Sequence, residues 1–178
     1  MIDITVKEVW AALTPSEKED VCLSFWEKSA FAQDLQPQVL RELAAALNLR
    51  EAALKRLPVA DKARYLRWKA DGPVLRHVRD HILRSWMVIR KNALLVCFVE
   101  AQGLKHSGGI VADDVQPPDT ETVKKAVRAI RDQFPPREVA LYLGVMLASG
   151  GDLWAGLRDA IETEFPSLKT LLTPTPPA

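Results

Sequence analysis

The sequence contains little glycine and little cysteine. Its 178 residues include eight glycines and two cysteines. So little glycine, beside many leucines and alanines, favours helices. Cys22 and Cys97 each fall within an apolar helical pattern, and neither has the Cys-x-x-Cys or other spacing of a metal ligand. We interpret both as buried thiols that pack as small apolar groups, and not as nucleophiles.

Long hydrophobic runs are also missing. The longest uninterrupted apolar run, Ala93 to Val99, is far shorter than the roughly 20 residues that a transmembrane helix needs. The first residues, Met1 to Glu8, lack the basic patch, apolar stretch and cleavage site of a secretory signal. We therefore expect a cytoplasmic protein that has no membrane partner.

Helix start and stop signals recur along the chain. Thr14-Pro15-Ser16-Glu17 has the pattern of a capping box with proline at the first helical position. Asp71-Gly72-Pro73 combines a helix stop with a restart. No repeat with a period of 20 to 50 residues is found. The sequence predicts an all-α fold, an irregular bundle of about seven or eight helices with one long central helix. The helices of this bundle can pack at near-perpendicular angles.

The long helix is expected from Val74 to about Gln102. Its first half is amphipathic, whereas Ala93 to Val99 is apolar on every side, which predicts a segment surrounded by other helices. With the apolar helix after Pro136, this segment is the expected centre of the core. We expect one domain over residues 1–172, a disordered Pro-rich tail over residues 173–178, and a connection from Gly103 to Asp119 that is either functional or mobile.

The basic residues are distributed unevenly. Residues 50–91 hold 12 Lys and Arg against four Asp and Glu, although the net charge of the whole chain is only +1. If these cations share a surface, they would attract phosphate backbones or an acidic partner. The alternative is that exposed helical faces simply use arginine. The candidate binding residues are Arg50, Lys55, Arg56, Arg64, Arg67, Trp68, Arg76, Arg79 and Arg84.

Residues 40–57 resemble a helix-turn-helix motif. Ala44 occupies the small position, and Asn48 stands where the turn usually has glycine, which asparagine can replace because it tolerates positive φ. Pro58 would shorten the recognition helix and leave Arg50, Lys55 and Arg56 as its DNA contacts. A core helical hairpin is the alternative, and we favour it. The hydrophobic anchors of the motif are Leu43, Leu47, Leu49, Leu54 and Leu57.

Two further patterns suggest ligands. Rings and cations alternate from Tyr65 to Lys69, as in proteins that stack single-stranded bases on aromatic side chains. The alternative, which we favour, places Trp68 in the core, at helical spacing from Tyr65. His77 and His81 lie one turn apart, but the segment lacks the glutamate of a zincin motif and has arginines around it. We expect solvated histidines and no metal site.

No glycine-rich phosphate loop, nucleophile elbow or convincing acid pair is present. We therefore predict a non-catalytic helical interaction protein, without a cofactor, that binds another macromolecule through a basic helical face. A protein is the favoured partner. The alternative is a nucleic-acid-binding protein or regulator that uses residues 40–57 and the basic region 50–91. An enzyme built around His77, His81 or His106 is a weaker third hypothesis.

Overall fold

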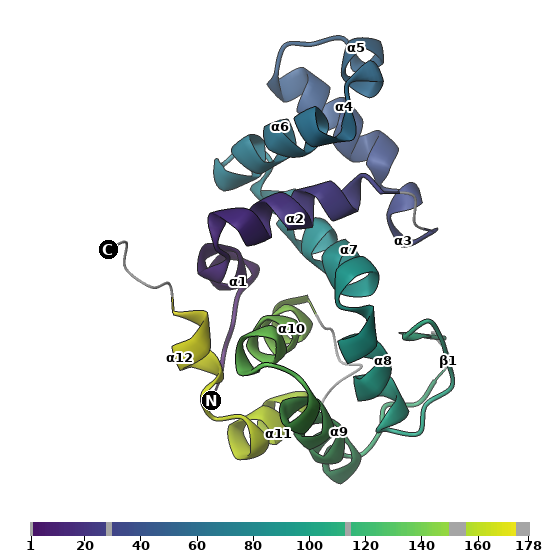
Figure 1. Cartoon of the computed structure of the whole chain (residues 1–178), viewed down its shortest axis with the longest axis vertical. Coiled ribbons are helices and arrows are strands. Elements are labelled where there is room, and N and C mark those ends of the chain that lie inside the picture. The colour runs from purple at the N-terminus through teal and green to yellow at the C-terminus, as the bar shows by residue number, and fades with distance from the viewer. Residues whose placement is uncertain (1, 28–29, 113–114, 150–155, 174–178) are drawn as a thin grey trace. The chain divides into compact units, whose positions relative to one another are not determined.

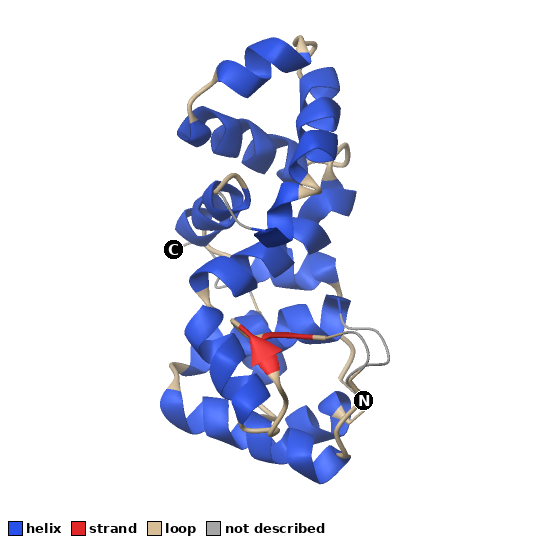
Figure 2. Ribbon diagram, turned by 90° about the vertical axis from the view of Figure 1, so that its right-hand side faces the viewer, coloured by secondary structure: helices blue, strands red, loops and turns tan. Residues whose placement is uncertain are grey.

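The computed structural model of the chain describes residues 2–27, 30–112, 115–149 and 156–173. Within these ranges the chain forms twelve α-helices, one short 3-10 helix and a two-stranded antiparallel hairpin (Figure 1). Figure 2 shows how little of the chain is extended, since only the hairpin is drawn as strand. The prediction of an all-α, multi-helix fold is confirmed. The helices outnumber the predicted seven or eight because the helix expected from Val74 is divided and because two short helices, α3 (Ala30–Gln33) and α12 (Leu168–Leu172), were not predicted.

The helices group into two compact units. The middle unit comprises Leu13–Arg90, and the terminal unit comprises Met1–Ala12 together with Lys91–Ala178. Among the described residues, no helix combines the length and apolar character needed to cross a membrane. The predicted tail lies almost entirely outside the described residues, which end at Thr173.

In the middle unit, α2 packs against both α6 and α7. The predicted capping box begins α2: the backbone N–H of Glu17 donates to the Thr14 hydroxyl, and the N–H of Thr14 donates to the Glu17 carboxylate. Cys22 is buried in this interface, as predicted, and burial raises the pKa of its thiol. The elements of the unit are α2 (Pro15–Phe25), α3 (Ala30–Gln33), α4 (Gln36–Ala46), α5 (Glu51–Arg56), α6 (Val59–Asp71), η1 (Arg76–Val78) and α7 (Arg79–Arg90).

The terminal unit is built around its most buried helix, α10. All residues from Val139 to Val145 are buried, and α1, α9, α11 and α12 pack around the helix. Gly144 lets α1 and α12 approach α10 closely, because a Cβ at residue 144 would lie 2.9 Å from the side chain of Leu172 and 3.2 Å from that of Val9. The predicted central position of this helix is confirmed. The elements are α1 (Val6–Ala12), α8 (Asn92–Glu100), β1 (His106–Ser107), β2 (Ile110–Val111), α9 (Thr120–Gln133), α10 (Pro136–Ser149), α11 (Leu157–Glu164) and α12 (Leu168–Leu172).

The predicted long helix is not continuous. Residues 74–102 form η1, α7 and α8, and the helix is interrupted at Lys91, whose φ and ψ are −109° and 25°. Adjacent side chains are held in different units: Arg90 pairs with Asp20 in the middle unit, whereas Lys91 pairs with Glu138 in the terminal unit. These partners are distant in sequence, so the helical pattern alone does not reveal the break.

The expected burial of α8 on every side is also wrong. Leu94, Phe98 and Val99 are buried, but Ala93 is exposed and the side chains from Leu95 to Cys97 are only half-buried. Cys97 is therefore not the fully buried thiol that the pattern predicts. The helix is covered mainly along the stripe that faces α9.

The connection after α8 contains the hairpin β1–β2, in which His106 is opposite Val111 and Ser107 is opposite Ile110. Gly108 and Gly109 form its turn, with φ values of 58° and 87°. A side chain at Gly109 would collide with Leu95 of α8, since its Cβ would lie 2.6 Å away. This part of the connection is therefore held against α8.

Candidate functional site

The helix-turn-helix-like segment forms a hairpin of α4 and α5. Asn48 has a φ of 54°, as predicted for the residue in the glycine position of the turn. The N–H of Leu49 donates to the carbonyl of Ala44 at 2.9 Å, and the N–H of Asn48 donates to that of Ala45 at 3.2 Å. This pair of bonds is the Schellman arrangement that satisfies the last carbonyls of a helix.

The second helix of this hairpin is short. α5 has six residues, which is about 9 Å of helix, and it ends at Arg56 because Pro58 follows the C-cap residue Leu57. Two of the predicted anchors, Leu43 and Leu54, are fully buried, but Leu49 is 42% exposed. Such a helix offers little length for reading a major groove, and the buried anchors agree with the alternative of a helical hairpin.

Three of the predicted binding residues are engaged within the middle unit. Arg64 pairs with Asp61 at 2.9 Å, and Arg84 pairs with Asp80 one turn earlier on α7. Arg79 donates to the carbonyl oxygens of Ala70 at 2.7 Å and Asp71 at 3.1 Å, which are at the C-terminal end of α6. Helix-end carbonyls need such partners, and partial burial lowers the pKa of Arg79. These arginines have structural roles that occupy their guanidinium groups.

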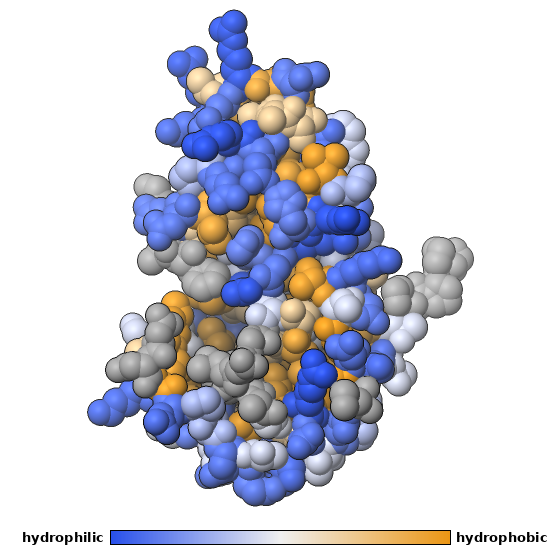
Figure 3. Space-filling view, turned by 180° about the vertical axis from the view of Figure 1, so that it is seen from behind, coloured by the Kyte–Doolittle hydropathy of each residue, from blue (hydrophilic) through white to orange (hydrophobic). Residues whose placement is uncertain are grey.

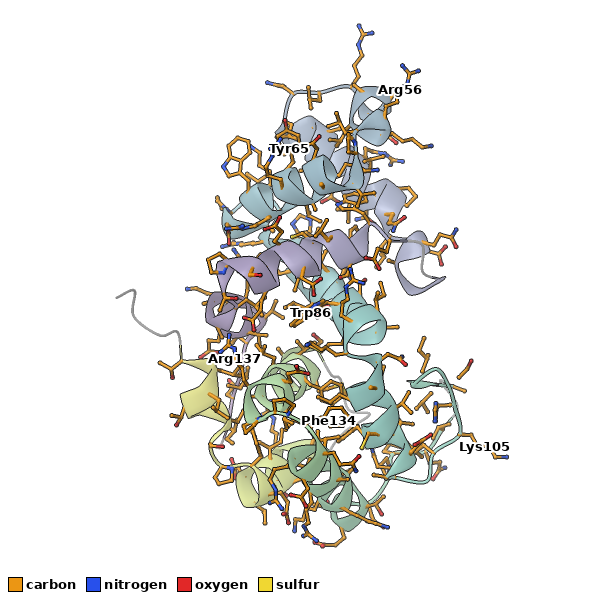
Figure 4. The ribbon with its side chains drawn as sticks, in the orientation of Figure 1. Arg56, Tyr65, Trp86, Lys105, Phe134 and Arg137 are labelled. Atoms are coloured by element: carbon orange, nitrogen blue, oxygen red, sulfur yellow. The ribbon has the colours of Figure 1, made fainter. Side chains whose placement is uncertain are left out.

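The other predicted cations have no such partners. No ion pair joins them to a carboxylate within the described part of the chain. All are exposed except Arg67, which is half-buried. They lie on and beside α5, on α6 and on η1, and Figure 4 shows Arg56 on α5. These residues are Arg50, Lys55, Arg56, Arg67 and Arg76.

Trp68 lies on the outer face of α6. The helix buries Ala63, Leu66 and Ala70, and at 100° per residue Trp68 points away from this stripe. Its side chain is 62% exposed, so the interpretation that it belongs to the core is wrong. The ammonium group of Lys69 lies 4.0 Å from the centre of the Trp68 ring, which is cation-π geometry.

Other large apolar side chains are exposed near these cations. In the parts of the chain that the structure describes, the five most exposed are Trp68, Val74, Ile110, Leu49 and Val59, and all but Ile110 belong to the middle unit. Figure 3 shows apolar residues interspersed with hydrophilic ones on one face of the protein. The sequence contained one signal for the valines, since Val59 and Val74 each directly follow a proline at a helix boundary.

Residues 72–75 fold back along the last turn of α6. The N–H of Leu75 donates to the carbonyl of Lys69 at 3.3 Å, which keeps Val74 close to the helix end. Val74 is 56% exposed, second only to Trp68 among the described large apolar residues. We call the group formed by Arg67, Trp68, Lys69, Val74 and Arg76 the Trp68 surface.

The histidines have other roles. The Nε2 atom of His77 lies 2.6 Å from Glu42 of α4, and the bonds from Gln38 and His77 lower the pKa of Glu42. His106 accepts a hydrogen bond from the N–H of Gly109 at 2.9 Å within the hairpin turn. Over the described residues, no group of three His, Cys, Asp or Glu side chains is arranged to hold a metal ion.

No protein-family model, curated protein or solved structure matches the chain. Its own surface is therefore the basis for a functional assignment.

Proposed function

We propose that the chain is a non-catalytic binding protein whose middle unit docks a partner protein through α5 and α6. The observation that carries this proposal is the exposure of Trp68, 62% of its side chain, beside cations without ionic partners. Tryptophan and arginine dominate the energetics of protein interfaces, because they combine large apolar area with specific polar contacts. An exposed indole among such cations is typical of an interface that is uncovered in the isolated protein.

The charge around Trp68 supports an acidic partner surface. Several positive charges have no ionic partner among the described residues: Arg50, Lys55 and Arg56 on and beside α5, Arg67 on α6, and Arg76 on η1. Such a field would accelerate encounter with an acidic partner and disfavour a basic one.

A protein fits this surface better than a nucleic-acid duplex does. α5 is short for a recognition helix, and the exposed aliphatic side chains of Leu49, Val59 and Val74 have no counterpart in a phosphate backbone. Single-stranded nucleic acid is the second candidate. The observation that favours it is the exposed ring of Trp68 beside the ammonium group of Lys69, because bases stack on open aromatic rings next to cations.

Site-specific photo-crosslinking tests the proposal. Benzoylphenylalanine in place of Trp68 should give a discrete protein adduct in an extract of the cells that make the chain, and nuclease treatment should not remove it. The matched control is the same amino acid in place of Lys125, an exposed residue of α9 in the terminal unit. Equal adducts at both positions, or none at position 68, would refute a partner surface on α6. A nuclease-sensitive adduct would favour nucleic acid.

A further inference from the structure

We infer that the Trp68 surface recognises an acidic amphipathic segment of the partner protein. In this arrangement a large apolar side chain packs on the free face of the Trp68 indole and on Val74, while carboxylates on either side of it pair with Arg67, Lys69 and Arg76. This inference rests on the proposed function and specifies the chemistry of the partner.

The position of Lys69 determines which part of the indole is open. Its ammonium group lies 4.0 Å from the ring centre and so occupies one face. Trp68 is nevertheless 62% exposed, so an apolar side chain packed on the open face would remove much of that area from water. The ammonium group retains N–H donors that can pair with a carboxylate beside the ring.

The nearby arginines differ in their availability. Arg79 is held by the carbonyl oxygens at the end of α6, and Arg64 is held by Asp61. Within the described residues neither Arg67 nor Arg76 has a carboxylate partner, and Arg76 is exposed. Carboxylates of a partner would therefore find guanidinium groups without displacing an internal ion pair, and an arginine can bind a carboxylate through two parallel hydrogen bonds.

Val74 distinguishes the acidic amphipathic segment from other polyanions. A purely acidic chain or a phosphate backbone would leave Val74 and the indole in contact with water. A single strand of nucleic acid would cover Trp68 but needs successive open rings, and the neighbouring ring, Tyr65, is half-buried with the guanidinium of Arg64 5.5 Å away. Apolar and acidic groups together match what this surface exposes.

The test uses the full chain and synthetic labelled probes. An acidic peptide with regularly spaced leucine and phenylalanine is compared with three others: the same peptide with serine at the apolar positions, the same peptide with lysine at the acidic positions, and an oligothymidine. Fluorescence anisotropy should detect binding of the first peptide alone. Binding should weaken as salt is raised, because exposed charge pairs are screened.

Variants locate the binding. Trp68→Ala should weaken binding by about tenfold or more, as expected for an interface tryptophan, and Trp68→Phe should restore part of the loss. Arg67→Gln and Arg76→Gln should each weaken it by about threefold. The matched control, Lys125→Gln, removes an exposed charge from the terminal unit and should leave the affinity unchanged.

Three results would overturn the inference. Equal binding of the serine-substituted peptide would show that no apolar contact contributes to binding. Tighter binding of oligothymidine than of the acidic peptide, with that binding lost in Trp68→Ala, would identify a stacking site for nucleic acid. No binding of the acidic amphipathic peptide at millimolar concentration would exclude the recognition chemistry. The crosslinking result at position 68 is separate from these, so a partner surface can be upheld even if this chemistry is wrong.

Discussion

The two units differ more at their surfaces than in their way of folding. The middle unit has 14 Lys and Arg against 10 Asp and Glu, a net charge of +4, whereas the terminal unit has 10 against 13, a net charge of −3. Among the described residues, four of the five exposed large apolar side chains also belong to the middle unit. A surface that combines charge of one sign with uncovered apolar groups is suited to binding, and this combination occurs in one unit.

The terminal unit uses its arginines internally. Arg128 and Arg131 both reach Glu164 of α11, at 2.6 and 3.4 Å, and Arg137 donates to the carbonyl of Ala12 at 2.9 Å. The pairing with Arg128 lowers the pKa of Glu164. Arginines of the middle unit are divided between such structural roles and the open surface around Trp68. Arginine content by itself therefore does not identify the binding unit.

The strongest test of the comparison is the loss of a core leucine from each unit. Leu66 of α6 and Leu143 of α10 are fully buried, so replacing either by alanine should lower the free energy of unfolding by about 2–5 kcal/mol. Urea denaturation measures this loss, and amide exchange locates it. If the units are separate domains, Leu66→Ala will raise exchange only in the middle unit. Raised exchange in both units would instead support one domain over residues 1–172.

A smaller loss of unfolding free energy is expected when a hydrogen bond between two helices of the middle unit is removed. The indole N–H of Trp86 on α7 donates to the Asp20 carboxylate of α2 at 2.7 Å, and Arg90 donates to the same carboxylate at 3.1 Å. Figure 4 shows where Trp86 lies on α7. Asp20→Ala should cost about 1–3 kcal/mol in thermal or urea unfolding, because the indole N–H loses its acceptor. Asp20→Asn keeps an acceptor oxygen, and a loss equal to that of alanine would contradict this explanation.

The stability that a helix cap contributes should depend on pH in the terminal unit but not in the middle unit. α9 of the terminal unit is capped by Asp119, whose carboxylate accepts a hydrogen bond from the N–H of Thr122 at 2.7 Å. This bond lowers the pKa of Asp119 below its ordinary value of 3.8. A carboxyl group whose pKa is lowered by folding stabilises the fold above its ordinary pKa, and the stabilisation is lost as the pH falls through the folded value.

Asp119→Asn keeps a capping oxygen and removes the charge. The unfolding temperature of the wild type should therefore exceed that of this variant at neutral pH, and the difference should vanish in acid. Thr14, which caps α2 of the middle unit, has a hydroxyl that does not titrate, so the difference between the wild type and Thr14→Ser should not vary with pH in this way. A constant difference for Asp119→Asn would show that its charge adds nothing to the cap.

The smallest effect on stability is expected at the proposed binding residue. Trp68→Ala should change the free energy of unfolding by no more than about 0.5 kcal/mol, as for other exposed positions. The buried tryptophan of the same unit, Trp86, is the contrast: Trp86→Ala should cost about 3–5 kcal/mol. Equal losses at the two tryptophans would mean that Trp68 belongs to the core, as its helical spacing from Tyr65 first allowed.

Several local features could be predicted because their causes are within a few residues. Thr14 and Glu17 form the capping box, Asn48 takes the positive φ of the hairpin turn, and Pro58 ends α5. The apolar helix after Pro136 is the most buried of its unit. In each case the local backbone geometry or the apolar pattern permits few alternatives.

The candidate site was predicted only in part. The region of residues 50–91 was identified by its charge, and Trp68 by its neighbours. The pattern did not reveal that Arg79 is held by the end of α6 or that Arg84 is held by Asp80. It also omitted Val59 and Val74, because an apolar residue at a helix boundary is usually taken as part of the core.

By itself the sequence determined the all-helical class, helix ends such as those marked by Thr14 and Pro58, and the uneven charge, because these depend on propensity, capping and composition. Only the tertiary structure decided that the helix predicted from Val74 breaks at Lys91, that Trp68 is exposed, and which arginines have partners. Those outcomes depend on contacts between residues far apart in the chain. A periodic pattern shows that a helix has a dry face and a wet face, but the neighbouring helices decide how much of each face is covered.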